Sequence, residues 1–337
     1  MINGHGDDLY KYGKIKINFS SNVYNHVDHS GLYEHICSHL DCIRSYPEPR
    51  PYSLEKALAE KHGVPEDMIC STNGATEAIY LLAQAYRDST SAVLVPTFSE
   101  YADACTLNSH RIIKFYSLDA IPSNASVIWI CNPNNPTGEA YDNDRIESLL
   151  ARYPQKLFII DQSYEAFTDR NLMYVADSLR YPNMVLLHSM TKCYAVPGLR
   201  LGYVTAHSEI ISRLRSFVKP WSVNALAVSS GLYLIKHSAG YKLDLDKILV
   251  EKDRVANALS SLGVMEVWPS DTHYMLIKLR FGKASSLKEY LAESHGILIR
   301  DASNFDGLDE SYFRIAVQTP EENDKLINAI GEWLCKM

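Results

Sequence analysis

Three short apolar runs of the sequence, SVIWI, KLFII and NMVLLH, are each followed by polar residues suited to catalysis or binding. The first leads into NPNNPTG, which contains Asn135; the second ends at Asp161; the third is followed closely by Lys192. If these runs are parallel strands, their carboxyl ends meet at one edge of a sheet, where ligands bind in such folds. An amide, a carboxylate and an amine are therefore expected together at that edge.

This combination of side chains is what pyridoxal phosphate requires of a protein. A lysine binds the cofactor covalently, a carboxylate keeps the pyridine nitrogen protonated, and donors hold the phenolic oxygen of the ring. Lys192 and Asp161 fit the first two roles, and Asn135 with Tyr164 fits the third. Singly, these residues are equally consistent with a surface lysine, a helix cap and a turn. Their joint placement at one sheet edge favours the cofactor.

The phosphate group of this cofactor needs backbone N–H groups at a helix N-terminus, together with hydroxyl groups and a planar cation. A predicted helix opens after residue 73, two hydroxyl residues precede Lys192, and an arginine follows it by eight residues. The predicted phosphate site consists of Gly74, Ala75, Thr76, Ser189, Thr191 and Arg200. Phe98, just past the apolar run SAVLV, is expected to cover the flat face of the ring, with Tyr101 as the second choice.

The elements that position these residues alternate between strand and helix in the middle of the chain. Strands are predicted at 91–95, 111–115, 126–130, 156–160 and 183–188. Runs that are apolar on both faces and separated by helices predict a mostly parallel sheet covered on both sides. The expected fold class is therefore α/β, with this sheet between helices in a large domain.

After about residue 223 the pattern changes to long amphipathic helices, followed by further strands. The helices are predicted at 223–237 and 241–261, and the strands near 273–280, 297–300 and 312–317. This order indicates a smaller α+β domain. The first 45 residues lack a strand–helix unit of their own and are expected to pack with it. The predicted division is a large cofactor-binding domain, 46–222, and a small discontinuous domain, 1–45 plus 223–337.

Composition excludes several classes of protein. The chain has 337 residues, 46% hydrophobic and 22% charged, as expected for a globular chain with a large core. A net charge of −7 without a basic stretch argues against nucleic acid as a partner. No apolar run reaches the roughly 18 residues of a membrane span, and MINGHGDDLY lacks the features of a signal or transit peptide. We expect a cytoplasmic protein without membrane contact.

The seven cysteines are scattered and form no CxxC pair. This usage is typical of reduced thiols, and it indicates neither a disulfide framework nor a metal site.

Five segments of the sequence resemble, in order, those of the class I/II aminotransferase superfamily of fold type I pyridoxal phosphate enzymes: NGATEA, PTFSEY, NPNNPTG, DQSY and SMTKCYAVPGLRLGY. The resemblance extends over essentially the whole chain and implies the type I fold of pyridoxal phosphate-dependent transferases. By this resemblance, Lys192 binds the cofactor covalently and Asp161 pairs with the pyridine nitrogen. Asn135 and Tyr164 hold the phenolic oxygen, and Arg200 clamps the phosphate.

The family fold also implies a homodimer whose active sites lie at the interface. Tyr46, in RSYPEPRPYSLEKALAEKHG, matches the family's RYPD-type segment, whose tyrosine reaches the cofactor phosphate of the neighbouring subunit; an ordinary packed tyrosine is the alternative. The chain departs from the family pattern at Gln162, where an acidic residue is usual, and at Cys193 after the lysine. Neither position has an assigned catalytic role, so we expect these residues to tune activity rather than abolish it.

The segment YFRIAV narrows the reaction. Phe313 and Ile315 share one face of the predicted strand, so Arg314 is directed away from that face. A partly buried guanidinium needs an anion, which by family resemblance is the substrate carboxylate; a structural salt bridge is the alternative. Arg300, at the end of the strand GILIR, is a second cation near the same edge. Two anion sites predict a doubly charged substrate, such as a phosphorylated amino acid.

Two related families, histidinol-phosphate aminotransferases and threonine-phosphate decarboxylases, fit such a substrate. The segments HGDDLYKYG, IKINFSSNVY and IRDASNFDGLDESYFRIAV resemble the decarboxylases more closely. This match makes His5 and Asn22 candidates for contact with the substrate, although His5 also fits an ordinary surface position. The favoured activity is a pyridoxal phosphate-dependent carboxy-lyase acting on L-threonine O-3-phosphate, and an aminotransferase is the alternative.

Other functional classes lack their sequence motifs. The GxGxxG and GxxxxGK[ST] patterns of nucleotide enzymes do not follow the first strand, and neither GxSxG nor HExxH occurs. A catalytically inactive regulator of the same fold remains an alternative outside enzymology. We expect such a regulator to carry a DNA-binding domain, for which 337 residues leave no room.

Overall fold

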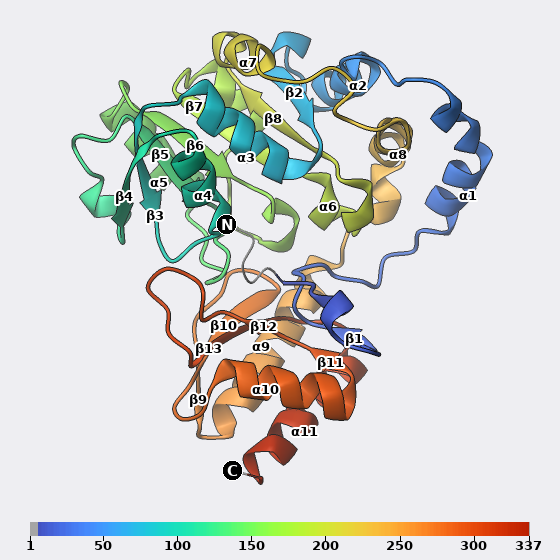
Figure 1. Ribbon diagram of the computed structural model, residues 1–337, viewed down its shortest axis with the longest axis vertical. Helices are drawn as coiled ribbons and strands as arrows, with labels where there is room; N and C mark the ends of the chain where they lie inside the picture. Colours follow the sequence, from blue (N-terminus) through green and yellow to red (C-terminus); the bar gives the residue numbers. More distant parts are fainter. Residues whose placement is uncertain (1–5, 337) are drawn as a thin grey trace.

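The computed structural model describes residues 6–336, and its largest element is a seven-stranded sheet in the upper half of Figure 1. The strands are β2 (Ile69–Thr72), β3 (Thr90–Leu94), β4 (Arg111–Phe115), β5 (Val127–Cys131), β6 (Leu157–Asp161), β7 (Met184–Ser189) and β8 (Gly202–Ala206). Their order across the sheet is β2-β8-β7-β6-β5-β3-β4. Only β8 runs antiparallel to its neighbours, β2 and β7. The mostly parallel sheet expected from the sequence is therefore confirmed.

Helices cover both faces of this sheet because its central strands are apolar on both sides. In β5, Trp129 faces one buried cluster while Ile128 and Ile130 face another. The first face is covered by α3 (Gly74–Ala85), α4 (Glu100–Leu107) and α7 (Ser208–Arg215), and the second by α5 (Asn143–Arg152). This alternation is the pattern of a parallel sheet buried between two helical layers.

A third cluster lies beside the edge strand β2, where α1 (Ser30–Ser38), α2 (Tyr52–His62) and α8 (Ala225–Lys236) pack together. A Cβ atom at Gly231 of α8 would lie 2.7 Å from Leu201 and 2.9 Å from Leu54, so glycine permits this close contact. The domain boundaries remain a prediction. The structure nevertheless places α1 and α8 beside the large sheet, whereas the sequence grouped them with the small domain.

The second sheet lies in the lower half of Figure 1. Its strands, in spatial order, are β12 (Arg300–Asp301), β13 (Tyr312–Ala316), β10 (Tyr274–Leu279) and β9 (Met265–Val267), all antiparallel. It packs with α9 (Leu245–Ser261), α10 (Ala284–Tyr290) and α11 (Pro320–Leu334). The short strand β1 (Ile17–Asn18) pairs in parallel with β11 (Ile297–Leu298), which brings the N-terminal segment to this half.

Short helices connect these elements. They are η1 (Leu9–Lys11), η2 (Leu40–Arg44), η3 (Glu66–Met68), η4 (Leu118–Ala120), η5 (Glu165–Phe167), η6 (Val175–Leu179), α6 (Met190–Cys193), η7 (Pro197–Leu199), η8 (Ser238–Tyr241) and the π-helical turn η9 (Leu291–His295). None of the helices formed by residues 6–336 has the length and hydrophobicity that a membrane-spanning helix requires.

Candidate active site

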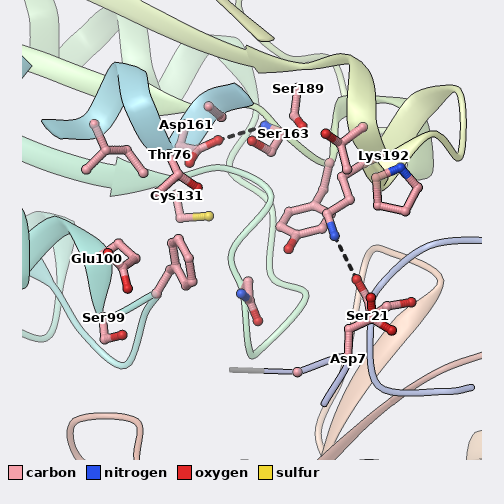
Figure 2. A pocket seen from close by; sticks show the side chains of 18 of the residues that line it. Asp7, Ser21, Thr76, Ser99, Glu100, Cys131, Asp161, Ser163, Ser189 and Lys192 are labelled. Atoms are coloured by element: carbon pink, nitrogen blue, oxygen red, sulfur yellow. Dashed lines mark hydrogen bonds between the residues drawn. The ribbon is translucent and has the colours of Figure 1, made fainter. Parts of the chain in front are cut away.

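A cavity of about 620 Å³ opens at the carboxyl ends of β5, β6 and β7, where the large sheet meets the second sheet and the N-terminal segment. Figure 2 shows this cavity from close by. Twelve residues predicted from the sequence line it: Ala75, Thr76, Phe98, Asn135, Asp161, Tyr164, Ser189, Thr191, Lys192, Arg200, Arg300 and Arg314. The structure therefore brings the predicted carboxylate, amine, amide and cations into one space.

Lys192 lies on α6, directly after β7, and its amine points into the cavity. Its Nζ atom donates a hydrogen bond to the backbone carbonyl of Ser21 at 2.7 Å, and it lies 5.9 Å from the centre of the Tyr164 ring. Burial, helped by the positive charge of Arg314, lowers the pKa of Lys192 to about 8. A larger fraction of the amine is then neutral near neutral pH, as a nucleophile requires.

Asp161 ends β6, and Figure 2 shows it with Ser163 on the side of Lys192 opposite to Ser21. It is buried, and it accepts hydrogen bonds from the Ser163 N–H at 2.9 Å and from the Tyr101 hydroxyl at 2.7 Å. Burial raises the pKa of the carboxyl group, and these two hydrogen bonds counteract the rise. Because both partners are neutral, a cationic group in the cavity would stabilise this carboxylate further.

The hydrogen bond from Tyr101 to Asp161 was not predicted from the sequence. Tyr101 was expected only as a second choice for covering the ring. The structure buries Tyr101 and stacks it on Trp129, and both Tyr101 and Phe98 line the cavity. A buried tyrosine hydroxyl usually finds a hydrogen-bond partner. The sequence did offer one signal for this contact. Tyr101 follows the predicted strand that becomes β3, so it was expected near the same sheet edge as Asp161.

Tyr164 and Asn135 provide donors near Lys192. Burial raises the pKa of Tyr164, so its hydroxyl keeps its proton and can donate. The side-chain oxygen of Asn135 accepts a hydrogen bond from Arg314, which leaves the N–H groups of its amide as donors. Both residues are buried and line the cavity.

The start of α3 lies beside the guanidinium group of Arg200. A Cβ atom at Gly74, which has a φ of +81°, would lie 2.6 Å from an Arg200 guanidinium nitrogen. Glycine therefore allows the guanidinium to approach the helix N-terminus. Ala75, Thr76, Ser189 and Thr191 line the cavity beside it. Backbone N–H groups, hydroxyl groups and a planar cation are the donors that a phosphate requires.

Arg300 and Arg314 are direct cross-strand neighbours on β12 and β13, and both side chains are buried. Arg314 donates to Asn135 and to the Ser20 carbonyl, and its Nε atom has no hydrogen-bond partner among residues 6–336. Arg300 donates to the Asp301 carbonyl and to the Asn304 side chain at 2.6 Å. All of these acceptors are neutral oxygens, so the predicted alternative of a structural salt bridge is not what the described residues show.

This pair of cations is costly without a counter-ion. Like charges directly opposite each other on neighbouring strands are destabilising, and a buried guanidinium needs an anion. Burial and the charge of Arg314 lower the pKa of Arg300 to about 10, although the carboxylates of Asp301 and Asp8 oppose this shift. The cavity therefore favours a ligand that brings two anionic groups to this end.

Three other predicted residues do not line the cavity. Asn22 is fully buried and does not line the cavity; the neighbouring Ser20 and Ser21 line it instead. Tyr46 is 84% exposed and its ring contacts that of Trp221 at a tilt, outside the cavity lining of its own chain, so its role toward a partner subunit remains a prediction. Gly74 contacts Arg200 without lining the cavity. His5 lies outside the described residues.

The two departures from the family pattern have structural explanations. Gln162 is buried, and its amide donates to the Met173 carbonyl at 3.1 Å. Burial raises the pKa of the Cys193 thiol to about 12, so this thiol stays protonated and is a poor nucleophile. Neither side chain lines the cavity.

The residues present fit pyridoxal phosphate as the bound group. The buried Asp161 fits a protonated ring nitrogen, the donors of Tyr164 and Asn135 fit the phenolic oxygen, and Phe98 fits the flat face. Lys192 supplies an amine for the covalent bond, and the α3 site fits the phosphate. Within residues 6–336, no group of three histidine, cysteine or acidic side chains is arranged to hold a metal ion.

The sequence and the fold match known proteins over nearly the whole chain. Residues 14–330 match the model of the family "Aminotransferase class I and II". The structure superimposes on the crystal structure of L-threonine-O-3-phosphate decarboxylase from Porphyromonas gingivalis with a TM-score of 0.93 and 39% sequence identity, covering 95% of this chain and 99% of that one.

Curated relatives include enzymes of two activities. The threonine-phosphate decarboxylase of Salmonella typhimurium is 29% identical over 88% of this chain and 85% of its own length. The histidinol-phosphate aminotransferase of Flavobacterium psychrophilum is 30% identical over 86% of each chain.

Proposed function

The chain belongs to the class I and II aminotransferase family, and from this premise we propose that it is a pyridoxal phosphate-dependent decarboxylase of a phosphorylated amino acid, L-threonine O-3-phosphate. The reaction would release CO₂ and leave the phosphate ester of an amino alcohol. The protein would act as a cytoplasmic homodimer in which Tyr46 reaches the neighbouring subunit's cofactor phosphate.

The observation that carries the proposal is the pair of buried arginines at one end of the cavity. Arg314 and Arg300 bind only neutral oxygens among the described residues, and they lie side by side on paired strands. A substrate with a carboxylate and a phosphate would supply one anion to each guanidinium. We assign the carboxylate to Arg314, which is bound to Asn135, and the phosphate to Arg300.

The residues at the other end would hold the cofactor. Arg200, the N-terminus of α3, Thr76, Ser189 and Thr191 would bind its phosphate, and Asp161 would keep its ring nitrogen protonated. When bound, pyridoxal phosphate supplies a ring that accepts the electron pair left behind when a bond to the substrate's α-carbon breaks.

The remaining chemistry falls to the chain's own side chains. The amine of Lys192 lies in the cavity, where it would deliver a proton to the α-carbon of the substrate when it is not bonded to the cofactor. Arg300 and Arg314 fix the substrate at two points and therefore fix its orientation about the α-carbon. That orientation would decide which bond to the α-carbon is placed to break.

Transamination of histidinol phosphate is the second candidate, and the relatives with that activity support it. Both substrates carry a phosphate, so the anion site beside Arg300 does not separate them. Histidinol phosphate has no carboxylate, but 2-oxoglutarate, the co-substrate of that reaction, would supply one to Arg314, so the two buried guanidinium groups fit both reactions. The 39% identity to the structure of a threonine-phosphate decarboxylase over 95% of this chain supports the decarboxylase.

One assay separates these activities. The purified holoenzyme is given threonine phosphate alone, and then histidinol phosphate with 2-oxoglutarate, while CO₂ and glutamate are measured. We expect CO₂ from the first mixture, and no release from a Lys192→Ala control. Glutamate from the second mixture without CO₂ from the first would replace the decarboxylase by the aminotransferase.

A further inference from the structure

Ser20, Ser21 and Asn22 form a short arch. The residues on either side of it are hydrogen-bonded to the part of the molecule that contains the second sheet. Before the arch, Phe19 donates to the Leu298 carbonyl at 2.8 Å and accepts from the Ala316 N–H at 2.9 Å. After it, the Val23 carbonyl accepts from the Gln318 side chain at 3.0 Å. Both ends of the arch are therefore held while its middle extends toward the large sheet.

Two consecutive carbonyl groups of this arch bind the two central cations of the cavity. The Ser20 carbonyl accepts from Arg314, and the Ser21 carbonyl accepts from Lys192 at 2.7 Å. Figure 2 shows the second of these bonds as a dashed line. Lys192 comes from the large sheet and Arg314 from β13, so the arch joins the two halves of the site.

Asn22 gives the arch its shape through its backbone. Its φ is +52°, in the left-handed region that residues other than Gly, Asn and Asp rarely adopt. Its side chain is fully buried, neither polar atom of its amide has a hydrogen-bond partner among the described residues, and it does not line the cavity. The backbone conformation of Asn22 therefore acts on the site through the neighbouring carbonyl groups, whereas its side-chain amide makes no hydrogen bond there among the described residues.

We infer that Asn22 is a positioning residue: its left-handed backbone turns the arch so that the carbonyls of Ser20 and Ser21 hold Arg314 and Lys192 at the cavity. This inference rests on the proposed roles of Lys192 and Arg314, and the substrate contact that the sequence suggested for Asn22 stays a separate prediction. The competing account is that the amide itself acts, for example on the hydroxyl of its neighbour Tyr164, where it opposes the rise in pKa that burial causes.

Glycine and alanine at position 22 separate the two accounts, because both delete the amide but only glycine adopts a positive φ without strain. The first measurement is binding of pyridoxal phosphate to the cofactor-free protein, followed by visible absorbance. We expect Asn22→Ala to weaken binding roughly tenfold, the scale of the strain of a left-handed alanine. The affinity of Asn22→Gly for pyridoxal phosphate should stay within about threefold of that of the wild type.

The second measurement is the pH midpoint for acylation of Lys192 in the cofactor-free protein. The charged and titratable groups near its amine are Arg314, Asp7, Arg200, Asp161, Tyr164 and His273. The Ser21 carbonyl accepts from the protonated amine and so favours the charged form. If the arch shifts, this acceptor is lost and the midpoint should move to lower pH in Asn22→Ala, but not in Asn22→Gly.

Ser109 provides a matched control, since it is an exposed residue with a φ of +60° that does not line the cavity. Ser109→Ala and Ser109→Gly should differ in unfolding midpoint, as the variants at position 22 do. They should leave cofactor binding and the Lys192 midpoint unchanged.

Equal weakening of cofactor binding in Asn22→Ala and Asn22→Gly would overturn the inference in favour of the amide. Wild-type binding by Asn22→Ala would overturn it as well. If Asn22→Ala does not fold, Asn22→Gly alone decides, because a tenfold loss in that variant contradicts a backbone role. Neither measurement uses a substrate, so a failure here is distinct from a wrong substrate assignment.

Discussion

The cofactor end of the cavity is built from the carboxyl ends of neighbouring strands and the start of one helix, whereas the substrate end is assembled from segments far apart in the chain. Asp161 is the last residue of β6, and Lys192 follows the adjacent strand β7. At the other end, Arg314 bonds to the Ser20 carbonyl, 294 residues away.

The two ends also differ in how their charges are compensated. At the cofactor end, Asp161 has two hydrogen-bond donors, and Arg200 lies beside a helix N-terminus that favours anions. At the substrate end, two buried guanidinium groups are direct cross-strand neighbours, and within residues 6–336 their hydrogen bonds go to neutral oxygens only. The charges at the cofactor end are therefore compensated by the protein itself, whereas the two guanidinium groups at the substrate end need an anionic ligand as their counter-ion.

The largest effect should follow a change at the cofactor end that leaves the fold intact. Asp161→Asn preserves shape but cannot hold the ring nitrogen protonated, so we expect turnover to fall by about 10³-fold, the scale of losing a preorganised electrostatic contact. The visible absorbance of the bound cofactor should persist, because Lys192 is unchanged. Activity within about threefold of the wild type would remove Asp161 from its assigned role.

Changes to Arg314 should be nearly as harmful and should show that geometry matters as much as charge. Arg314→Ala is expected to reduce kcat/KM by about 30-fold to 1,000-fold, since it leaves the substrate carboxylate unpaired. Arg314→Lys should be almost equally impaired, because an ammonium group cannot form the bidentate contact. A lysine variant close to the wild type would show that charge alone suffices.

Arg200 should affect the cofactor end without changing the choice of substrate. Arg200→Ala removes a charge-assisted contact at the start of α3, which is worth about 1.5 to 3 kcal/mol. The dissociation constant for pyridoxal phosphate should rise by roughly tenfold to a hundredfold in equilibrium dialysis. A variant that stays fully loaded through dialysis would exclude Arg200 from phosphate binding.

Tyr101 should give the smallest effect and a defined pH dependence. Its hydroxyl donates to the ionised form of Asp161 and so opposes the rise in pKa that burial causes. In Tyr101→Phe this opposition is lost, the pKa of Asp161 rises, and the acid limb of the activity profile should move to higher pH. At pH values above that limb, we expect a loss of about fivefold to tenfold. An acid limb that does not move would contradict the link between Tyr101 and Asp161.

The same contrast between the two ends explains what the sequence could reveal. The polar residues at the ends of β5, β6 and β7 were predictable because each follows an apolar run directly, and the predicted strand bounds lie within a residue of the observed ones. The strands β2 and β8 were missed because ICST and GYVTA are short and partly polar although fully buried. The place of α8 depended on packing against α2 that no local pattern shows.

At the substrate end, the sequence could supply the residue types but not their contacts. Arg300 and Arg314 were predicted as cations near one edge, yet their pairing across β12 and β13 depends on strand register. The backbone bonds from Ser20 and Ser21 leave no trace in side-chain identity. The hydrogen bond from Tyr101 to Asp161 likewise joins residues that are 60 positions apart.

The central claim is that Arg300 recognises a phosphate on an amino acid whose carboxylate is held by Arg314. The most direct test compares kcat/KM for threonine phosphate and threonine in the wild-type holoenzyme and in Arg300→Ala. We predict that the wild type prefers the phosphate ester by about 30-fold or more, as expected for a buried charged pair, and that this preference collapses in the variant. Equal turnover of the two substrates by the wild type, or an undiminished preference in Arg300→Ala, would contradict the account.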